Sequence, residues 1–273
     1  MGEALAGDEK LFHFTGRCQH LKLVPAKKSR VGIWVFEGAI MLENNTPLLI
    51  YIKAAITEPE PLTVDRIVRE WSNIIDEKHG KETTLLAFDT YYFSAATREQ
   101  QNQLGGRYVC ACTEPKVSTL AKALAHVKKP GEWSGIYSSV KKECIIKYYD
   151  PNPDINIKYA YSNCVVKTAR KEKGTKQRVT DVPIYDDIKA HFAGCDLFNK
   201  QLINHTWPFR HTGRRSPGWR AQEHNFALSS ILQNCINIYS YVNQKEAGAE
   251  SYQNWCCELA DELYQHALDM PMA

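Results

Sequence analysis

The sequence has no pair of cysteines with the spacing of a metal site. It holds nine cysteines, an odd number, and the closest pairs are Cys110-Ala111-Cys112 and Cys256-Cys257. Structural zinc sites usually need two C-x-x-C pairs, or one with spaced histidines, and no C-x-x-C is present. The pattern argues against a zinc module and favours scattered, reduced thiols in an intracellular protein.

Several other signals are also missing. No apolar run approaches the length of a transmembrane helix, and no basic region followed by an apolar run marks a signal peptide at the start. We therefore expect a soluble protein without membrane contact. There is no Gly-rich phosphate loop, serine nucleophile elbow or clustered histidine site, which argues against an enzyme acting on small molecules.

What remains is ordinary globular composition. The chain has 273 residues, of which 44% are hydrophobic and 24% charged, with a formal net charge of +3. These values allow a full core and argue against wholesale disorder. The small positive charge alone says little about partners.

Strand and helix patterns alternate along the first two thirds of the chain. Residues 31–36 and 48–52 are β-branched and aromatic, and a turn signal between them predicts a hairpin. Apolar residues at helical spacing follow Thr63. Further strands are predicted over 83–88, 108–112, 136–139, 144–149 and 155–161, and further helices over 95–104, 118–127, 222–241 and 250–268. This order predicts an α/β fold with a mixed sheet flanked by helices.

The same patterns suggest four parts. We predict a loose N-terminal segment over residues 1–20 and a core over 21–166. A basic loop or insertion is predicted over 167–192. The remaining residues, 193–273, are predicted to form a helical region.

Two acids stand at the ends of predicted elements. The strand predicted over 83–88 ends on Asp89, and Asp196 follows just over a hundred residues later in Ala193-Gly194-Cys195-Asp196. Acids so placed could converge on one divalent metal ion, because Mg²⁺ prefers oxygen ligands. The alternatives are a turn acid after a strand for Asp89 and a helix N-terminal acid for Asp196.

Basic residues gather in two places. Residues 167–178 hold six Lys or Arg against one Glu, and residues 207–220 interleave arginines with Trp, Phe and His. Such mixtures suit a polyanion groove, in which arginines neutralise phosphates and rings stack on bases. A solvated loop and an interhelical loop packed on its own domain are the alternatives. The candidate DNA-binding residues are Lys171, Lys173, Lys176, Arg178, Arg210, Arg214, Arg215 and Arg220.

An ordered set of motifs resembles the piggyBac-type transposases. Phe88-Asp89-Thr90-Tyr91-Tyr92-Phe93-Ser94 resembles their strand–acid–aromatic signature, and residues 27–35 resemble the segment that opens their first hairpin. Residues 193–196 and 207–211 resemble later stretches, and a helix with Asn234, Asn237 and Tyr239 follows. The resemblance spans about residues 27–241.

This resemblance implies an RNase H-like (DDE) domain with a C-terminal helical region. It implies Mg²⁺-dependent cleavage of a phosphodiester at a transposon end, followed by attack of the freed 3′-hydroxyl. On that basis Asp89 corresponds to the first catalytic acid and Asp196 to the last, both as metal ligands, with Asp150 as the third. Duplex DNA of the transposon-end type is the implied partner, the location is nuclear, and a homodimer is left open.

The chain also departs from the family pattern. No carboxylate follows the strand that ends at Ser162-Asn163, where the family has its middle acid. Asp150 precedes that strand, in a run that is also a good turn sequence. Asn199 stands where the family often has an additional acid. These departures predict a domesticated protein derived from a transposable element, with DNA binding retained and a degenerate catalytic site. The alternative is a non-catalytic DNA-binding or protein-interaction module.

Overall fold

The computed structural model describes most of the first 163 residues and two later stretches. The described ranges are 4–14, 17–25, 30–42, 45–56, 62–78, 85–112, 122–138, 143–149, 157–163, 193–202 and 218–244, with eight further residues between 254 and 265. The predicted basic loop over 167–192, Asp150 and seven of the eight candidate DNA-binding residues lie outside these ranges.

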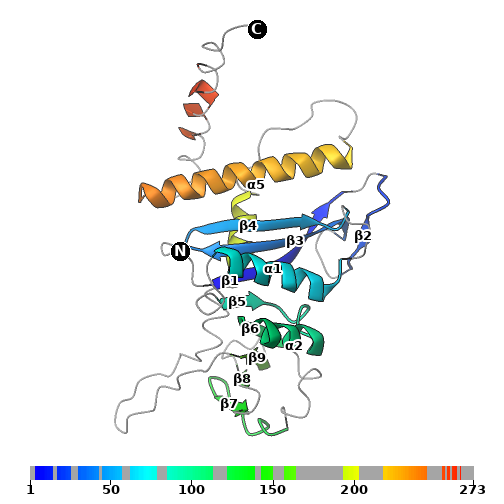
Figure 1. Cartoon of the computed structure of the whole chain (residues 1–273), viewed down its shortest axis with the longest axis vertical. Helices are drawn as coiled ribbons and strands as arrows, with labels where there is room; N and C mark the ends of the chain where they lie inside the picture. Colours follow the sequence, from blue (N-terminus) through cyan, green and yellow to red (C-terminus); the bar gives the residue numbers. More distant parts are fainter. Residues whose placement is uncertain are drawn as a thin grey trace.

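The described residues form a nine-stranded mixed sheet (Figure 1). Its strands are β1 (Ala4–His13), β2 (Lys22–Leu23), β3 (Val31–Met41), β4 (Pro47–Ala54), β5 (Leu85–Phe88), β6 (Arg107–Cys112), β7 (Trp133–Ser138), β8 (Glu143–Tyr149) and β9 (Ile157–Ser162). The order is β2-β3-β1-β5-β6-β9-β8-β7, with β4 also paired to β3. β1, β5 and β6 run parallel, whereas both flanks of the sheet are antiparallel. The predicted mixed α/β fold is confirmed.

β1 is an inner strand of this sheet. It pairs with β3 on one side and β5 on the other, and Ala4, Leu5 and Ala6 are almost fully buried. The prediction of a loose segment over residues 1–20 is therefore wrong for residues 4–13. Pairing with two neighbours fixes this strand although its own residues are poor strand formers.

The helices α1 (Val64–Lys78) and α2 (Ala95–Leu104) cover one face of the sheet (Figure 1). α1 buries Ile67, Val68, Trp71 and Ile75, which recur at helical spacing, against the main core. Trp71 packs so closely on β1 that a Cβ on Gly7 would come within 2.3 Å of its ring. Gly7 therefore has no room for a side chain.

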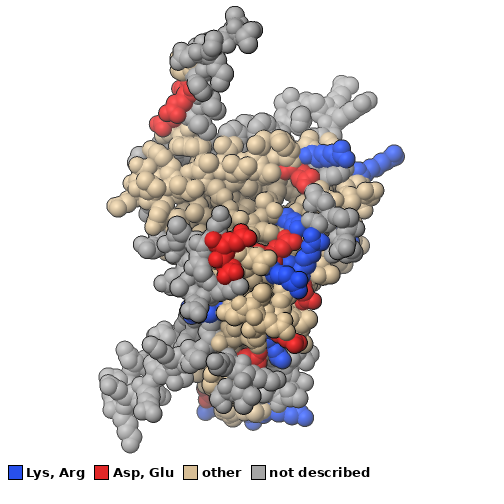
Figure 2. Space-filling model, viewed as in Figure 1, with Lys and Arg blue, Asp and Glu red and all other residues tan. Residues whose placement is uncertain are grey.

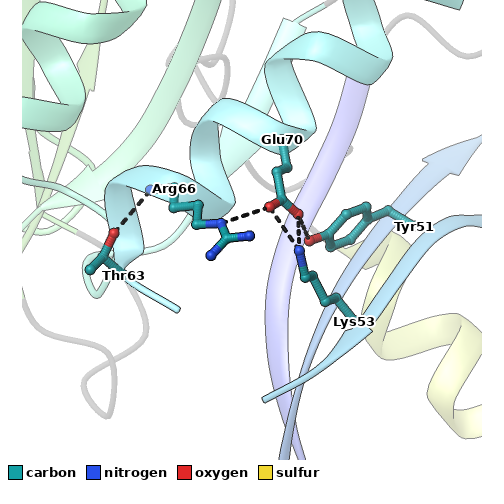
Figure 3. Close-up of polar contacts among 5 residues, drawn as sticks. All are labelled: Tyr51, Lys53, Thr63, Arg66 and Glu70. Atoms are coloured by element: carbon teal, nitrogen blue, oxygen red, sulfur yellow. Dashed lines mark hydrogen bonds and ion pairs between the residues drawn. The ribbon is translucent and has the colours of Figure 1, made fainter. Parts of the chain in front are cut away.

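A carboxylate on α1 ties this helix to β4 (Figure 3). Glu70 accepts hydrogen bonds from the Tyr51 hydroxyl at 2.6 Å and from Lys53 Nζ at 2.8 Å. Arg66, one turn earlier, donates its Nε–H to the same carboxylate at 3.2 Å. Burial raises the pKa of Glu70, but the bonds from Lys53 and Tyr51 and the nearby cations outweigh it, so the pKa is lowered overall.

The opposite face carries a helical segment, residues 193–202, and the long helix α5 (Trp219–Val242) runs along β4. Cys195 and Phe198 of the segment are fully buried against Ala6, Ala39 and Leu49. Residues 225–244 contain no Lys, Arg, Asp or Glu, and Figure 2 shows an uncharged belt over α5. No helix in the described ranges is long and apolar enough to span a membrane.

Most predicted elements are present with shifted ends. The 31–36/48–52 hairpin is β3 and β4, and the predicted helices over 95–104 and 222–241 are α2 and α5. One helix is not confirmed, since residues 122–126 form turns and residues 118–121 are not described. The described residues from 254 to 265 are helical, in agreement with a last helix there. The predicted division of residues 21–273 into three parts remains a prediction.

Candidate functional site

Asp8 and Asp89 come next to each other on neighbouring parallel strands. The register of β1 and β5 pairs Gly7 with Phe88, and each acid is the following residue. Adjacent strands lie about 4.8 Å apart, so the two backbones are neighbours. Asp89 Oδ1 accepts a hydrogen bond from the Tyr91 backbone N–H at 2.7 Å, which fixes the turn after β5. Both acids are half-buried.

Asp8 points away from α1. Side chains alternate along a strand, and the preceding Gly7 faces Trp71, so Asp8 lies on the opposite face. Glu37 on β3 is paired directly with Asp8 and is fully buried. Its neighbour Gly38 also faces Trp71, which places Glu37 on the same face as Asp8.

The helical segment 193–202 brings Asp196 to this face. Cys195 donates its thiol hydrogen to the Ala6 carbonyl on β1 at 3.3 Å. The segment lies close to β3 at Gly194, where a Cβ would make an ordinary van der Waals contact with Ala39 at 3.5 Å. Asp196, the next residue after Cys195, is exposed. We call Asp8, Glu37, Asp89 and Asp196 together the acid face.

The pKa values of two groups near the acid face are raised by burial and by its charges. Burial raises the pKa of the Cys195 thiol, and the charges of Glu37, Asp8 and Asp196 raise it further. Burial also raises the pKa of Tyr92, with added effects from Glu9, Asp8 and Asp89. The charge of Asp8 therefore raises the pKa of both Cys195 and Tyr92.

A lysine and an asparagine lie beside the acids. Lys10 Nζ donates to Asn199 Oδ1 at 2.6 Å, and Asn199 Nδ2 donates to Glu37 Oε2 at 2.7 Å. The Lys10 ammonium also sits 4.6 Å from the centre of the Phe226 ring on α5. Burial lowers the pKa of Lys10, whereas the charge of Glu37 raises it.

The predicted site residues fall into two groups. Asp89 and Asp196 lie within the described ranges. Asp89 follows Phe88, which pairs with β1, and Asp196 follows Cys195, which hydrogen-bonds β1. Asp150 is not described; the residue before it, Tyr149, ends β8, which lies three strands from β5. Of the candidate DNA-binding residues only Arg220 is described, and it is exposed in the first turn of α5.

Sequence reasoning missed Asp8. The segment around it lacks β-branched residues, so its pattern predicts no strand and gives no reason to single out Asp8. The usable signal was the apolar run Ala4-Leu5-Ala6 directly before Asp8-Glu9. Glu37, after the predicted strand 31–36, had no assigned role.

The acid face has the donor chemistry of a magnesium site but not its arrangement. Carboxylates suit Mg²⁺. Yet within the described ranges no three His, Cys, Asp or Glu side chains are placed so that they could hold a metal ion. Lys10 and Asn199 reach into the same region. The described residues therefore do not fit a ready two-metal centre.

Comparisons with known proteins support the fold. No protein-family model and no curated protein matches this sequence. The structure is similar to a chain in the cryo-EM structure of a piggyBac transposase synaptic complex with hairpin DNA, with a TM-score of 0.70. The fold is piggyBac-transposase-like. The similarity covers 100% of this chain at 15% sequence identity, and this chain spans 55% of the length of that one.

Proposed function

We propose that this chain is a DNA-binding protein on an RNase H-like transposase core, derived from a transposable element and no longer cutting DNA. The observation that carries the proposal is the convergence of Asp8, Asp89 and the Asp196 helix on one sheet face. RNase H-like nucleases and transposases place their three acids on neighbouring strand and helix ends. Here Asp8 lies within β1 beside the end of β5, Asp89 directly follows β5, and Asp196 lies in the first turn of the helical segment.

The DNA-binding part of the proposal has two supports. The similar transposase is bound to hairpin DNA in its solved complex. In this chain, the basic residues over 167–178 and 207–220 supply positive charge for phosphate contacts. Duplex DNA in the nucleus is the proposed target. A homodimer remains a prediction.

The loss of cleavage rests on the side chains of the acid face. Asn199 holds an amide three residues after Asp196, where the family often has a further acid. Its amide oxygen already accepts from Lys10, and its amide nitrogen already donates to Glu37. The acids are not gathered into a group that could hold a metal as they stand.

Fluorescence anisotropy with a labelled 30-base-pair duplex and a labelled hairpin tests DNA binding. We expect affinity to fall steeply between 50 and 200 mM salt. The double variant Arg214→Glu/Arg215→Glu should weaken binding roughly tenfold or more and flatten the salt dependence. The matched control is Lys128→Glu/Lys129→Glu, which reverses two exposed charges just before β7. Salt-independent binding, or equal losses in both double variants, would reject the proposed interface.

A nicking assay tests the loss of cleavage. Supercoiled plasmid and hairpin DNA are incubated with the protein in Mg²⁺ or Mn²⁺, and with the variant Asp89→Ala. We expect no nicking above background from either protein. Metal-dependent nicking by the wild type that Asp89→Ala abolishes would show that the chain is an active enzyme.

A further inference from the structure

The side chain of Lys10 places a positive charge on the acid face. Lys10 follows Asp8 by two residues on β1, and residues two apart on a strand share a face. Its Nζ reaches Asn199 Oδ1 at 2.6 Å, and the Phe226 ring of α5 covers it at 4.6 Å. Contacts with two separate elements thus hold the ammonium on the face that carries Asp8 and Glu37.

The side-chain amide of Asn199 has one partner on its oxygen and another on its nitrogen, and these two partners fix its orientation. The Lys10 ammonium can only donate, so the amide oxygen must face Lys10, and this leaves the amide N–H to donate to Glu37 Oε2. Asn199 also lies three residues after Asp196, on the same side of the helical segment. The amide therefore connects the cation on β1 to the buried Glu37 on β3.

An aspartate at position 199 could not make this connection. The amide N–H that donates to Glu37 would be replaced by a second carboxylate. Two like charges in one site make each carboxylate harder to ionise. A divalent cation would then be needed to balance the site. With Asn199 at this position, the Lys10 ammonium of the chain itself balances the negative charge of the carboxylates.

We propose that Lys10 and Asn199 take the place of a divalent cation on the acid face, and that removing this pair restores metal binding. The wild type binds Mg²⁺ and Mn²⁺ weakly for this reason. The double variant Lys10→Gln/Asn199→Asp gains a divalent site built from the new carboxylate and the four acids of the acid face. This inference rests on the proposed descent of the acid face from a metal centre.

Isothermal titration calorimetry with Mn²⁺ tests this on the full chain, with electron paramagnetic resonance as a second measure of bound ion. The double variant should bind Mn²⁺ at least tenfold more tightly than the wild type. Adding Asp89→Ala to the double variant should remove the gain. Lys53→Gln is the control for loss of a lysine charge, because Lys53 pairs with Glu70 on the other side of the sheet; it should bind like the wild type.

Circular dichroism shows whether the double variant is folded. If it is not, the single variant Asn199→Asp is tested in its place. It should bind Mn²⁺ more tightly than the wild type by a smaller factor. Equal affinity of folded wild type and folded variants would overturn the inference, as would a gain that survives Asp89→Ala. DNA affinity measured in EDTA is independent of these outcomes, so failure here is distinguishable from failure of the proposed DNA binding.

Discussion

Asn234 on α5 hydrogen-bonds both backbone groups of Leu49 on β4. Its Oδ1 accepts from the Leu49 N–H at 2.9 Å, and its Nδ2 donates to the Leu49 carbonyl at 2.6 Å. β4 has a sheet partner only on its β3 side among the described strands. The side-chain amide thus takes the place of a neighbouring strand at this point of the sheet edge.

We predict that Asn234→Leu destabilises the protein by about 1–3 kcal/mol, because two partly buried backbone groups lose their partner. Urea unfolding followed by circular dichroism measures this. Asn243→Ala is the control, since the exposed side chain of Asn243 makes one hydrogen bond, to the Tyr239 carbonyl. It should change stability by about 0.5 kcal/mol or less. Equal effects would mean that α5 is not fastened through Asn234.

Glu70 gives a pH-dependent prediction. Its pKa is lowered in the folded protein, so its contribution is fully present above the unfolded value of about 4.5 and is lost as pH falls through the folded value. Glu70→Gln should therefore cost about 1 kcal/mol at pH 7, since the site is partly exposed. The difference from wild type should shrink below pH 4.5. Urea melts from pH 3 to 7 measure it.

The control for Glu70 is Glu77→Gln, an exposed position on the same helix. It should leave stability nearly unchanged at every pH. If the two variants behave alike, the Tyr51–Lys53–Glu70 contacts contribute nothing measurable to stability.

Gly7 and Trp71 form a pair that can be tested together. Gly7→Ala should destabilise the protein by about 1–3 kcal/mol, because its Cβ would overlap the Trp71 ring. In a Trp71→Ala background the same change should cost much less, since the ring is gone. A double-mutant cycle by urea unfolding gives the coupling energy. Additive effects would show that the two residues are not in contact.

The parts of the fold with strong local patterns were predictable. β3 and β4 are rich in β-branched and aromatic residues around a turn signal, and α1 repeats its apolar residues at helical spacing. Asp89 was found because a short buried strand visibly ends on it. Asp196 was predicted as an acid at the end of an element and from the family resemblance. The structure shows that the hydrogen bond of Cys195 to Ala6 holds its helix on β1.

β1 could not be predicted because contacts with distant parts of the chain, and not its local sequence, make it a strand. Its sequence Ala-Leu-Ala-Gly-Asp-Glu-Lys has no β-branched residue, and its glycine weakens any local preference for a strand. Gly7 is required by Trp71, which lies 64 residues away in the chain. Without β1 in place, Asp8, Glu37 and Lys10 cannot be recognised as neighbours, and the acid face stays incomplete.

The position of Asp196 depends on the buried thiol next to it, and that thiol can be probed. Cys195 is fully buried with a raised pKa, whereas Cys235 and Cys257 are exposed. Because the thiolate is the reactive form, we predict that iodoacetamide at pH 8 modifies Cys195 at least about tenfold more slowly than Cys235 or Cys257. Peptide mass spectrometry over a time course resolves the individual rates. In urea above the unfolding midpoint the rates should converge. Rapid labelling of Cys195 under native conditions would show that the helical segment 193–202 is not docked on β1, and Asp196 would then have no fixed place on the acid face.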